Sequence, residues 1–223
     1  MAVSRLRFMD RTDAGKQLAE RLSGLADEDV VVLALPRGGV PVAAEIARAL
    51  RAPLDVLGVR KLGAPQQPEF GVGAISEGGI RVVEPDSAVA AGLDEDAIAA
   101  VERRERRELQ RRVHVYRGDR VLPELAGRTV IVVDDGLATG VTARAACRAV
   151  RRHGPARLIL AVPVAPPRSV DALRAEADEV VVVHAPASLM SIGGWYDRFD
   201  QVSDDEVLEI LTEVGPTDDR HPS

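Results

Sequence analysis

The segment from Thr129 to Thr142, which reads TVIVVDDGLATGVT, constrains the fold more than any other part of the chain. It begins with a run of apolar residues, and such a run is typical of a strand that is buried on both faces of a parallel sheet. Two adjacent carboxylates, Asp134 and Asp135, follow the run, and a turn of small residues then leads into a helical pattern at residues 143–152. The segment therefore predicts a strand, a loop and a helix in direct succession.

The loop of this segment has the chemistry of a phosphate site. Its small residues let the backbone approach a ligand closely, and the following helix presents free N–H groups and the positive end of its dipole. A phosphate bound there would leave the two carboxylates beside it for hydroxyl groups or a metal ion. An ordinary strand, turn and helix in which Asp135 caps the helix would account for one acid but not for both.

The same residues resemble the phosphoribosyl pyrophosphate (PRPP) motif of type I phosphoribosyltransferases. Residue types and spacing agree over thirteen positions, whereas a Walker phosphate loop would need a Gly-Lys-Ser/Thr ending that the segment lacks. The resemblance implies that Asp134 and Asp135 bind the ribose hydroxyls, directly or through the waters of a Mg²⁺ ion. The residues expected to hold the 5-phosphate are Ala138, Thr139, Gly140, Val141 and Thr142.

A second strand with a glycine loop begins at Val30–Leu35 and continues into Pro36-Arg37-Gly38-Gly39. The two glycines suit an unusual backbone conformation with exposed N–H groups, although a tight turn between a strand and a helix would also use them. The resemblance implies that this loop binds pyrophosphate and that Arg37 stabilises the charge developing on it. Members of the family often hold a non-proline cis peptide here, and we place it between Arg37 and Gly38.

Arg60 and Lys61 follow a third expected strand, Leu54–Val59, and lie at the base of a long polar stretch. Long loops between strands are usually functional or mobile, and the resemblance implies a flexible loop that closes over PRPP. Arg60 would contact pyrophosphate with its planar fork and Lys61 as a point charge, with a solvated basic pair as the alternative. Short strands are expected at residues 71–75 and 80–83.

A charged helix is predicted from Asp94 to about Val115, with Asp94 as its N-cap. Its mixed signs permit ion pairs between residues four positions apart, such as Glu108 with Arg112. The interleaved glutamates favour a solvated or oligomer-facing helix over an RNA-binding one. We interpret residues 84–125 as a helical insertion between strands of the sheet.

Strands and helices alternate in the rest of the chain. A helix capped by Thr12 or Asp13 is predicted near the start, strands are predicted at Arg157–Val164 and Glu179–His184, and a helix lies between them at Ser169–Glu176. This alternation predicts an α/β fold, a central and mostly parallel sheet with helices on both faces. Ligands of such sheets bind at the carboxyl ends of the strands.

Most of the few aromatic residues gather between Ala185 and Gln201, after the last core strand. In the family a variable hood at this place holds the nucleobase, so Trp195 and Tyr196 are expected to stack on it. A flap that packs these rings on the core is the alternative. We expect a single domain at residues 1–214, with the hood at 185–201, and a disordered polar tail at 215–223.

Composition excludes several classes of protein. The net charge of −6 argues against a nucleic-acid partner, and no apolar run approaches the roughly 18 residues of a membrane span. The first residues show no pattern of a signal peptide, and Cys147 is the single cysteine, which fits a reducing cytoplasm.

The resemblance as a whole implies a pentosyltransferase that uses PRPP and Mg²⁺, acts on a nitrogenous base and releases pyrophosphate. A cytoplasmic homodimer is expected. The residues expected to act on the reacting groups are Arg37, Lys61, Asp134 and Asp135. A non-catalytic sensor of PRPP or nucleotides is the alternative, and the Arg37 loop together with Lys61 favours the enzyme.

The acceptor is left open by the sequence. Enzymes acting on 6-oxopurines carry an Asp immediately before the Thr-Gly of the motif, and Ala138 stands at that position here. A Phe-x-Asp-Arg opening and a Leu-Pro-Arg-Gly-Gly loop make the chain most similar to uncharacterised bacterial phosphoribosyltransferase-like proteins.

Overall fold

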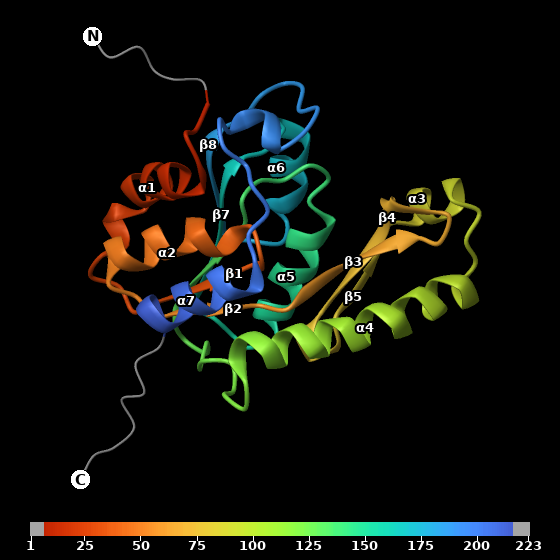
Figure 1. The fold of residues 1–223 in the computed structure, drawn as a ribbon, viewed down its shortest axis with the longest axis horizontal. Helices are drawn as coiled ribbons and strands as arrows, with labels where there is room; N and C mark the ends of the chain where they lie inside the picture. The colour runs from red at the N-terminus through yellow and green to blue at the C-terminus, as the bar shows by residue number, and fades with distance from the viewer. Residues whose placement is uncertain (1–6, 216–223) are drawn as a thin grey trace.

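The computed structural model describes residues 7–215 and places a parallel sheet at the centre of the molecule (Figure 1). Its strand order is β2-β1-β6-β7-β8, and every neighbouring pair is parallel. The strands are β1 (Val30–Ala34), β2 (Leu54–Val56), β6 (Thr129–Val133), β7 (Arg157–Val164) and β8 (Glu179–His184). The predicted α/β fold with a central parallel sheet is therefore confirmed.

Both faces of the sheet are covered, which explains why β1 and β6 are buried along their whole length and almost entirely apolar. Successive residues of a strand point to opposite faces, so Val32 enters one core and Leu33 the other. The first core lies under α1 (Arg11–Arg21), α2 (Gly39–Leu50) and α7 (Asp204–Val214). The second lies under α5 (Val141–Arg151) and α6 (Pro167–Leu173).

A second, antiparallel sheet forms an arm that projects from the main body (Figure 1). The arm, residues 59–117, contains β3 (Val59–Ala64), β4 (Gln67–Ser76), the 3-10 turn η2 (Glu77–Gly79), β5 (Arg81–Val83), α3 (Pro85–Ala90) and α4 (Glu95–Arg117). The helices of the predicted insertion thus pack on a second sheet, beside the predicted parallel one. Leu62 and Ile75 of this sheet are fully buried in one cluster with Leu109 of α4.

The arm corrects two expectations. The expected third strand divides into β2 and β3, and the expected flexible loop after Lys61 is instead a hairpin between β3 and β4. The polar stretch conceals the strands because its buried residues find their apolar partners on α4, which lies more than 30 positions away in the chain. Local patterning cannot reveal a partner at that separation.

Several element ends also differ from expectation. Asp10, rather than Thr12 or Asp13, caps α1 by accepting a hydrogen bond from the Asp13 N–H. A short 3-10 turn, η1 (Ser23–Leu25), follows that helix. The cis peptide of the glycine loop lies between Pro36 and Arg37, one bond before the expected position.

The C-terminal part contains a further helix, beyond the predicted elements. Helix α7 follows the hood, and Ser203 and Glu206 form a capping box at its start. The hood contains the 3-10 turn η3 (Gly193–Trp195) and pairs with the N-terminal segment through a bridge between Phe8 and Tyr196. The predicted tail lies outside the described residues except for Gly215, and the single domain at 1–214 remains a prediction. None of the helices in residues 7–215 is long and apolar enough to cross a membrane.

A buried ion-pair network joins the arm to the main body. Arg117, at the end of α4, pairs with Glu77 of η2 at 2.7 Å and with Asp55 of β2 at 3.4 Å. The Arg117 side chain is 4% exposed and that of Asp55 is 1% exposed, so neither charge has solvent to replace a lost partner. Burial raises the pKa of Asp55, and the charge of Arg117 opposes that shift.

The exchange Arg117→Met should lower the free energy of unfolding by about 3 kcal/mol, because it leaves the buried Asp55 and the partly buried Glu77 without their counter-charge. Urea denaturation of the whole chain measures this loss. Arg103→Met on the exposed side of the same helix is the control and should change stability by no more than about 0.5 kcal/mol. Equal stability of the two variants would contradict the role given to Arg117.

Candidate functional site

Two of the predicted loops meet where β1 and β6 end. These strands pair in register, with Ala34 opposite Val133, so the chain segments that follow them lie side by side. A Cβ atom on Gly38 would lie 2.0 Å from Oδ2 of Asp135, and one on Gly39 would lie 2.6 Å from the carbonyl oxygen of Val133. The glycines are therefore required by the close approach of the two loops. The expected unusual conformation is wrong for Gly38, whose φ of −59° and ψ of −34° suit any residue.

The PRPP-motif loop, residues 134–142, leads into the N-terminus of α5 as predicted. Gly140 has a φ of 77°, a left-handed conformation that glycine adopts without steric cost, and this residue starts the helix. The N–H groups of residues 138–143 donate to no acceptor within residues 7–215. Residues 138–142 line a cavity of about 280 Å³, and Lys61 and Gly71 of the arm line it as well. The loop thus offers unpaired donors to an anion.

The two carboxylates lie at the rim of this phosphate-loop cavity and have unequal surroundings. Burial raises the pKa of Asp134, and the neighbouring Asp135 raises it further. Burial also raises the pKa of Asp135, but Arg11 opposes this shift by donating its Nε–H to Oδ2 at 2.9 Å. Asp134 is therefore the acid that lacks a direct cationic partner among the described residues.

The donor set fits a weakly held Mg²⁺ ion. No cluster of three or more His, Cys, Asp or Glu residues that could hold a metal occurs in residues 7–215, so the protein would supply at most the two carboxylates. Mg²⁺ commonly binds in this way, through one or two carboxylates, several waters and the phosphates of a substrate. A cation beside Asp134 would also offset the repulsion between the two acids.

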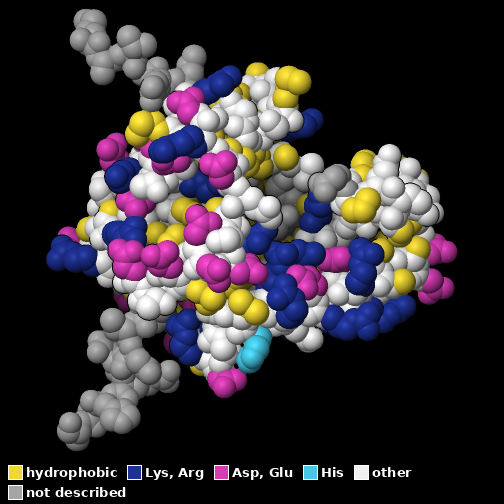
Figure 2. Space-filling view, viewed as in Figure 1, with side chains coloured by type: hydrophobic (Ala, Val, Ile, Leu, Met, Phe, Trp, Pro, Cys, Tyr) yellow, Lys and Arg dark blue, Asp and Glu magenta, His cyan; other side chains and the backbone are white. Residues whose placement is uncertain are grey.

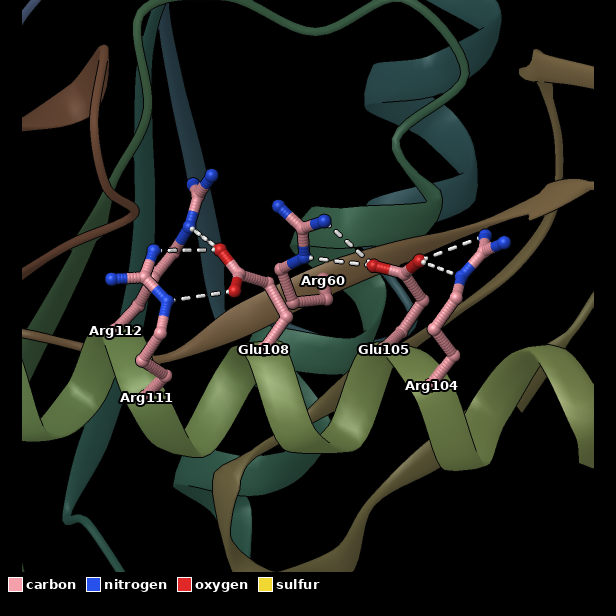
Figure 3. Close-up of polar contacts among 6 residues, drawn as sticks. All are labelled: Arg60, Arg104, Glu105, Glu108, Arg111 and Arg112. Carbon is pink, nitrogen blue, oxygen red and sulfur yellow. Dashed lines mark hydrogen bonds and ion pairs between the residues drawn. The ribbon is translucent and has the colours of Figure 1, made fainter.

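The side chains of Arg60 and Lys61 point to opposite faces of β3. Neighbouring residues of a strand face opposite sides, and Lys61 lines the phosphate-loop cavity whereas Arg60 does not. Arg60 instead donates to Oε2 of Glu105 at 3.0 and 2.6 Å (Figure 3). The two side chains therefore lie on different faces of β3, and a contact of Arg60 with pyrophosphate stays a prediction.

Arg37 projects toward a second cavity beside the first. Its guanidinium lies 3.6 Å from a carboxylate oxygen of Asp204, at the start of α7. This cavity, of about 560 Å³, is lined by Arg11, Arg37 and Arg112, by Gly38 and Asp135, and by hood residues including Ile192 and Phe199. Asp135 and Ile192 border both cavities, so the two are adjacent. Figure 2 shows a hollow between the main body and the arm, with Lys and Arg side chains along its edge.

The hood places its aromatic rings differently from expectation. Tyr196 is buried, stacks near Phe8 at 5.3 Å between ring centroids and donates its hydroxyl to the carbonyl oxygen of Asp135 at 2.6 Å. Trp195 packs near His184 at 5.6 Å, and neither ring lines the two cavities. The alternative of a flap packed on the core describes these two residues better than base stacking.

Some cavity residues were not assigned a role from the sequence. Arg11 belongs to the Phe-x-Asp-Arg opening, a motif that by itself indicates only a likeness to other proteins. The sequence pairs Arg112 with Glu108 four positions earlier, a pattern that predicts a local ion pair on the surface of the helix. Ile192 and Phe199 lie in an irregular segment whose path no periodic pattern predicts.

Comparison with known proteins identifies the family of the chain. The model of the phosphoribosyl transferase domain family matches residues 8–190. Two curated relatives from strains of Mycobacterium tuberculosis, named "Putative phosphoribosyl transferase" MT0597 and Rv0571c, are each 52% identical over 204 residues. The match covers 92% of this chain and 46% of each relative, so the chain spans about half of their length.

A solved structure also shares the fold. The crystal structure of TT1426 from Thermus thermophilus is 44% identical and superposes with a TM-score of 0.77, over 94% of this chain and 100% of that one. The strand order, the loop after β6 and these matches lead to one conclusion: the chain belongs to the phosphoribosyl transferase domain family, with a type I phosphoribosyltransferase fold.

Proposed function

We propose that this protein transfers the phosphoribosyl group of PRPP to a nitrogenous acceptor and releases pyrophosphate. The observation that carries the proposal is the phosphate-loop cavity, where unpaired N–H groups, two carboxylates and Lys61 face the same space. A sugar phosphate matches this set, because it needs amide donors for its phosphate and carboxylate acceptors for its hydroxyls.

Each group would have a distinct task in binding the donor. The N–H groups of residues 138–142 and the hydroxyls of Thr139 and Thr142 would hold the 5-phosphate. Asp134 and Asp135 would accept hydrogen bonds from the ribose hydroxyls and would hold Mg²⁺ through water. When bound, Mg²⁺ would neutralise charge on the pyrophosphate group. Arg37, the Gly38 backbone and Lys61 would contact the same group from the protein.

The reaction then follows from charge and position. The acceptor nitrogen forms the new bond to C1 of the ribose with its lone pair, while the bond from C1 to oxygen breaks and its electrons leave with pyrophosphate. The proton on the acceptor nitrogen passes to water. The protein contributes mainly by aligning the two reactants and by placing cations beside the leaving group. The expected homodimer and cytoplasmic location remain predictions.

Pyrophosphate release is the direct test. The whole chain, supplied with PRPP and Mg²⁺, should release pyrophosphate in the presence of at least one member of a panel of nitrogenous bases. Tight nucleotide binding with no release from any base would instead support the sensor considered above, because a sensor has no leaving group to stabilise.

The double exchange Asp134→Asn and Asp135→Asn should abolish PRPP binding in calorimetry while the fold survives, because amides cannot supply the negative charge that the ion and hydroxyls need. The matched control is Asp86→Asn with Glu95→Gln, two acids of the arm that line neither cavity. Unchanged PRPP affinity in the first variant would refute the assignment of the donor site.

Gly38→Ala should lower the rate of pyrophosphate release by roughly 100-fold, because the new methyl group would displace Asp135 from its place. Steady-state kinetics measure the loss, and circular dichroism verifies the fold. Gly24→Ala is the control, since a Cβ there meets nothing within 4 Å, and it should retain full activity. If both variants are equally active, the loops do not need their close approach.

A further inference from the structure

The wall of the second cavity is unusually rich in arginine. Among the described residues that line it, three are arginines, namely Arg11, Arg37 and Arg112, and Asp135 is the sole acid. That acid already accepts the hydrogen bond from Arg11. Arg37 faces Asp204 at 3.6 Å, beyond hydrogen-bond distance. Each arginine thus has one carboxylate partner, but Asp204 and Glu108 lie outside the lining, so the wall itself carries more cationic than anionic groups.

Arg112 differs from the other two because it approaches from the arm. Its Nε–H donates to Oε1 of Glu108, one turn earlier on α4, at 2.8 Å. Its two terminal nitrogens donate to no acceptor within the described part of the chain, and Figure 3 shows them pointing away from the helix. Hydrogen bonds from Arg111 and then from Arg112 lower the pKa of Glu108 to about 2, so this carboxylate stays charged and holds both arginines.

The hood contributes an aromatic ring to the same cavity. Phe199 of the hood is 36% exposed and lines the same cavity. The guanidinium of Arg11 lies 3.8 Å from the centre of its ring and fixes it in place, while also donating to the carbonyl oxygen of Asp200 at 2.8 Å. Ile192 separates this surface from the phosphate-loop cavity, so a molecule here would lie beside the ribose of the donor.

We propose that the part of the second cavity lined by Arg112, Phe199 and Ile192 binds the acceptor and selects a planar ring that carries an anionic group. Arg112 is the residue that recognises the charge, while Arg37 and Gly38 in the same lining would contact the pyrophosphate. A ring would contact Phe199 and Ile192, and its carboxylate would accept hydrogen bonds from the free edge of Arg112. Glu108 acts as a positioning residue, because it orients that edge toward the cavity. This inference rests on the proposed function, for which it names the class of acceptor.

Pairs of ring compounds that differ only in charge provide the test. The probes are nicotinate against nicotinamide and orotate against uracil, titrated into the whole chain by calorimetry. At least one carboxylate should bind about tenfold more tightly than its neutral counterpart. Arg112→Gln should abolish this preference. Arg111→Gln should retain it, because Arg111 shares Glu108 but lines neither cavity.

Titrations with PRPP and with pyrophosphate distinguish a failure of the proposed function from a failure of the acceptor proposal. Wild-type protein and Arg112→Gln should bind PRPP equally. Equal affinity for charged and neutral rings, no binding of either carboxylate at millimolar concentration, or the same loss in Arg111→Gln would overturn the proposal. So would a loss of pyrophosphate affinity in Arg112→Gln, which would assign Arg112 to the donor. Failure of the wild-type protein to bind PRPP would instead refute the proposed function.

Discussion

The close approach of the β1 and β6 loops is the constraint on which the rest of the site depends. Parallel pairing brings the ends of these strands level, and the chain then has room for a loop beside Asp135 only if Gly38 carries no side chain. The same approach leaves Gly39 against the carbonyl oxygen of Val133, at the start of α2. Backbone geometry, rather than any single hydrogen bond, therefore sets the distance between the two loops.

The second determinant of the site is the balance of charge around Asp134 and Asp135. Asp134 and Asp135 repel each other because they are adjacent carboxylates. Arg11, from the N-terminal segment, offsets part of this repulsion by donating a hydrogen bond to Asp135. The same guanidinium also contacts Phe199 and Asp200 of the hood, and Tyr196 bonds to the backbone of Asp135. The acids, the N-terminal segment and the hood are consequently one connected structure.

Sequence patterning predicted the parts of the fold that are locally encoded. The buried strands at 157–164 and 179–184 were predicted with their observed bounds, and the loop before α5 was predicted from its motif, because short-range patterns determine both. The hairpin after Lys61 escaped prediction because its apolar partners lie on α4. The separation of Arg60 from Lys61 needed the strand assignment first, and Arg11 needed a contact 124 positions away.

The hydrogen bonds between Arg60 and Glu105 have a mechanical consequence. Lys61 is the next residue on β3, and Glu105 lies on α4 between the two ends of that helix. A movement that brings Lys61 closer to the phosphate loop must therefore carry α4, and with it Arg112, in the same direction. The arm would then move as one body rather than as a flexible flap, and the two cavities would open and narrow together.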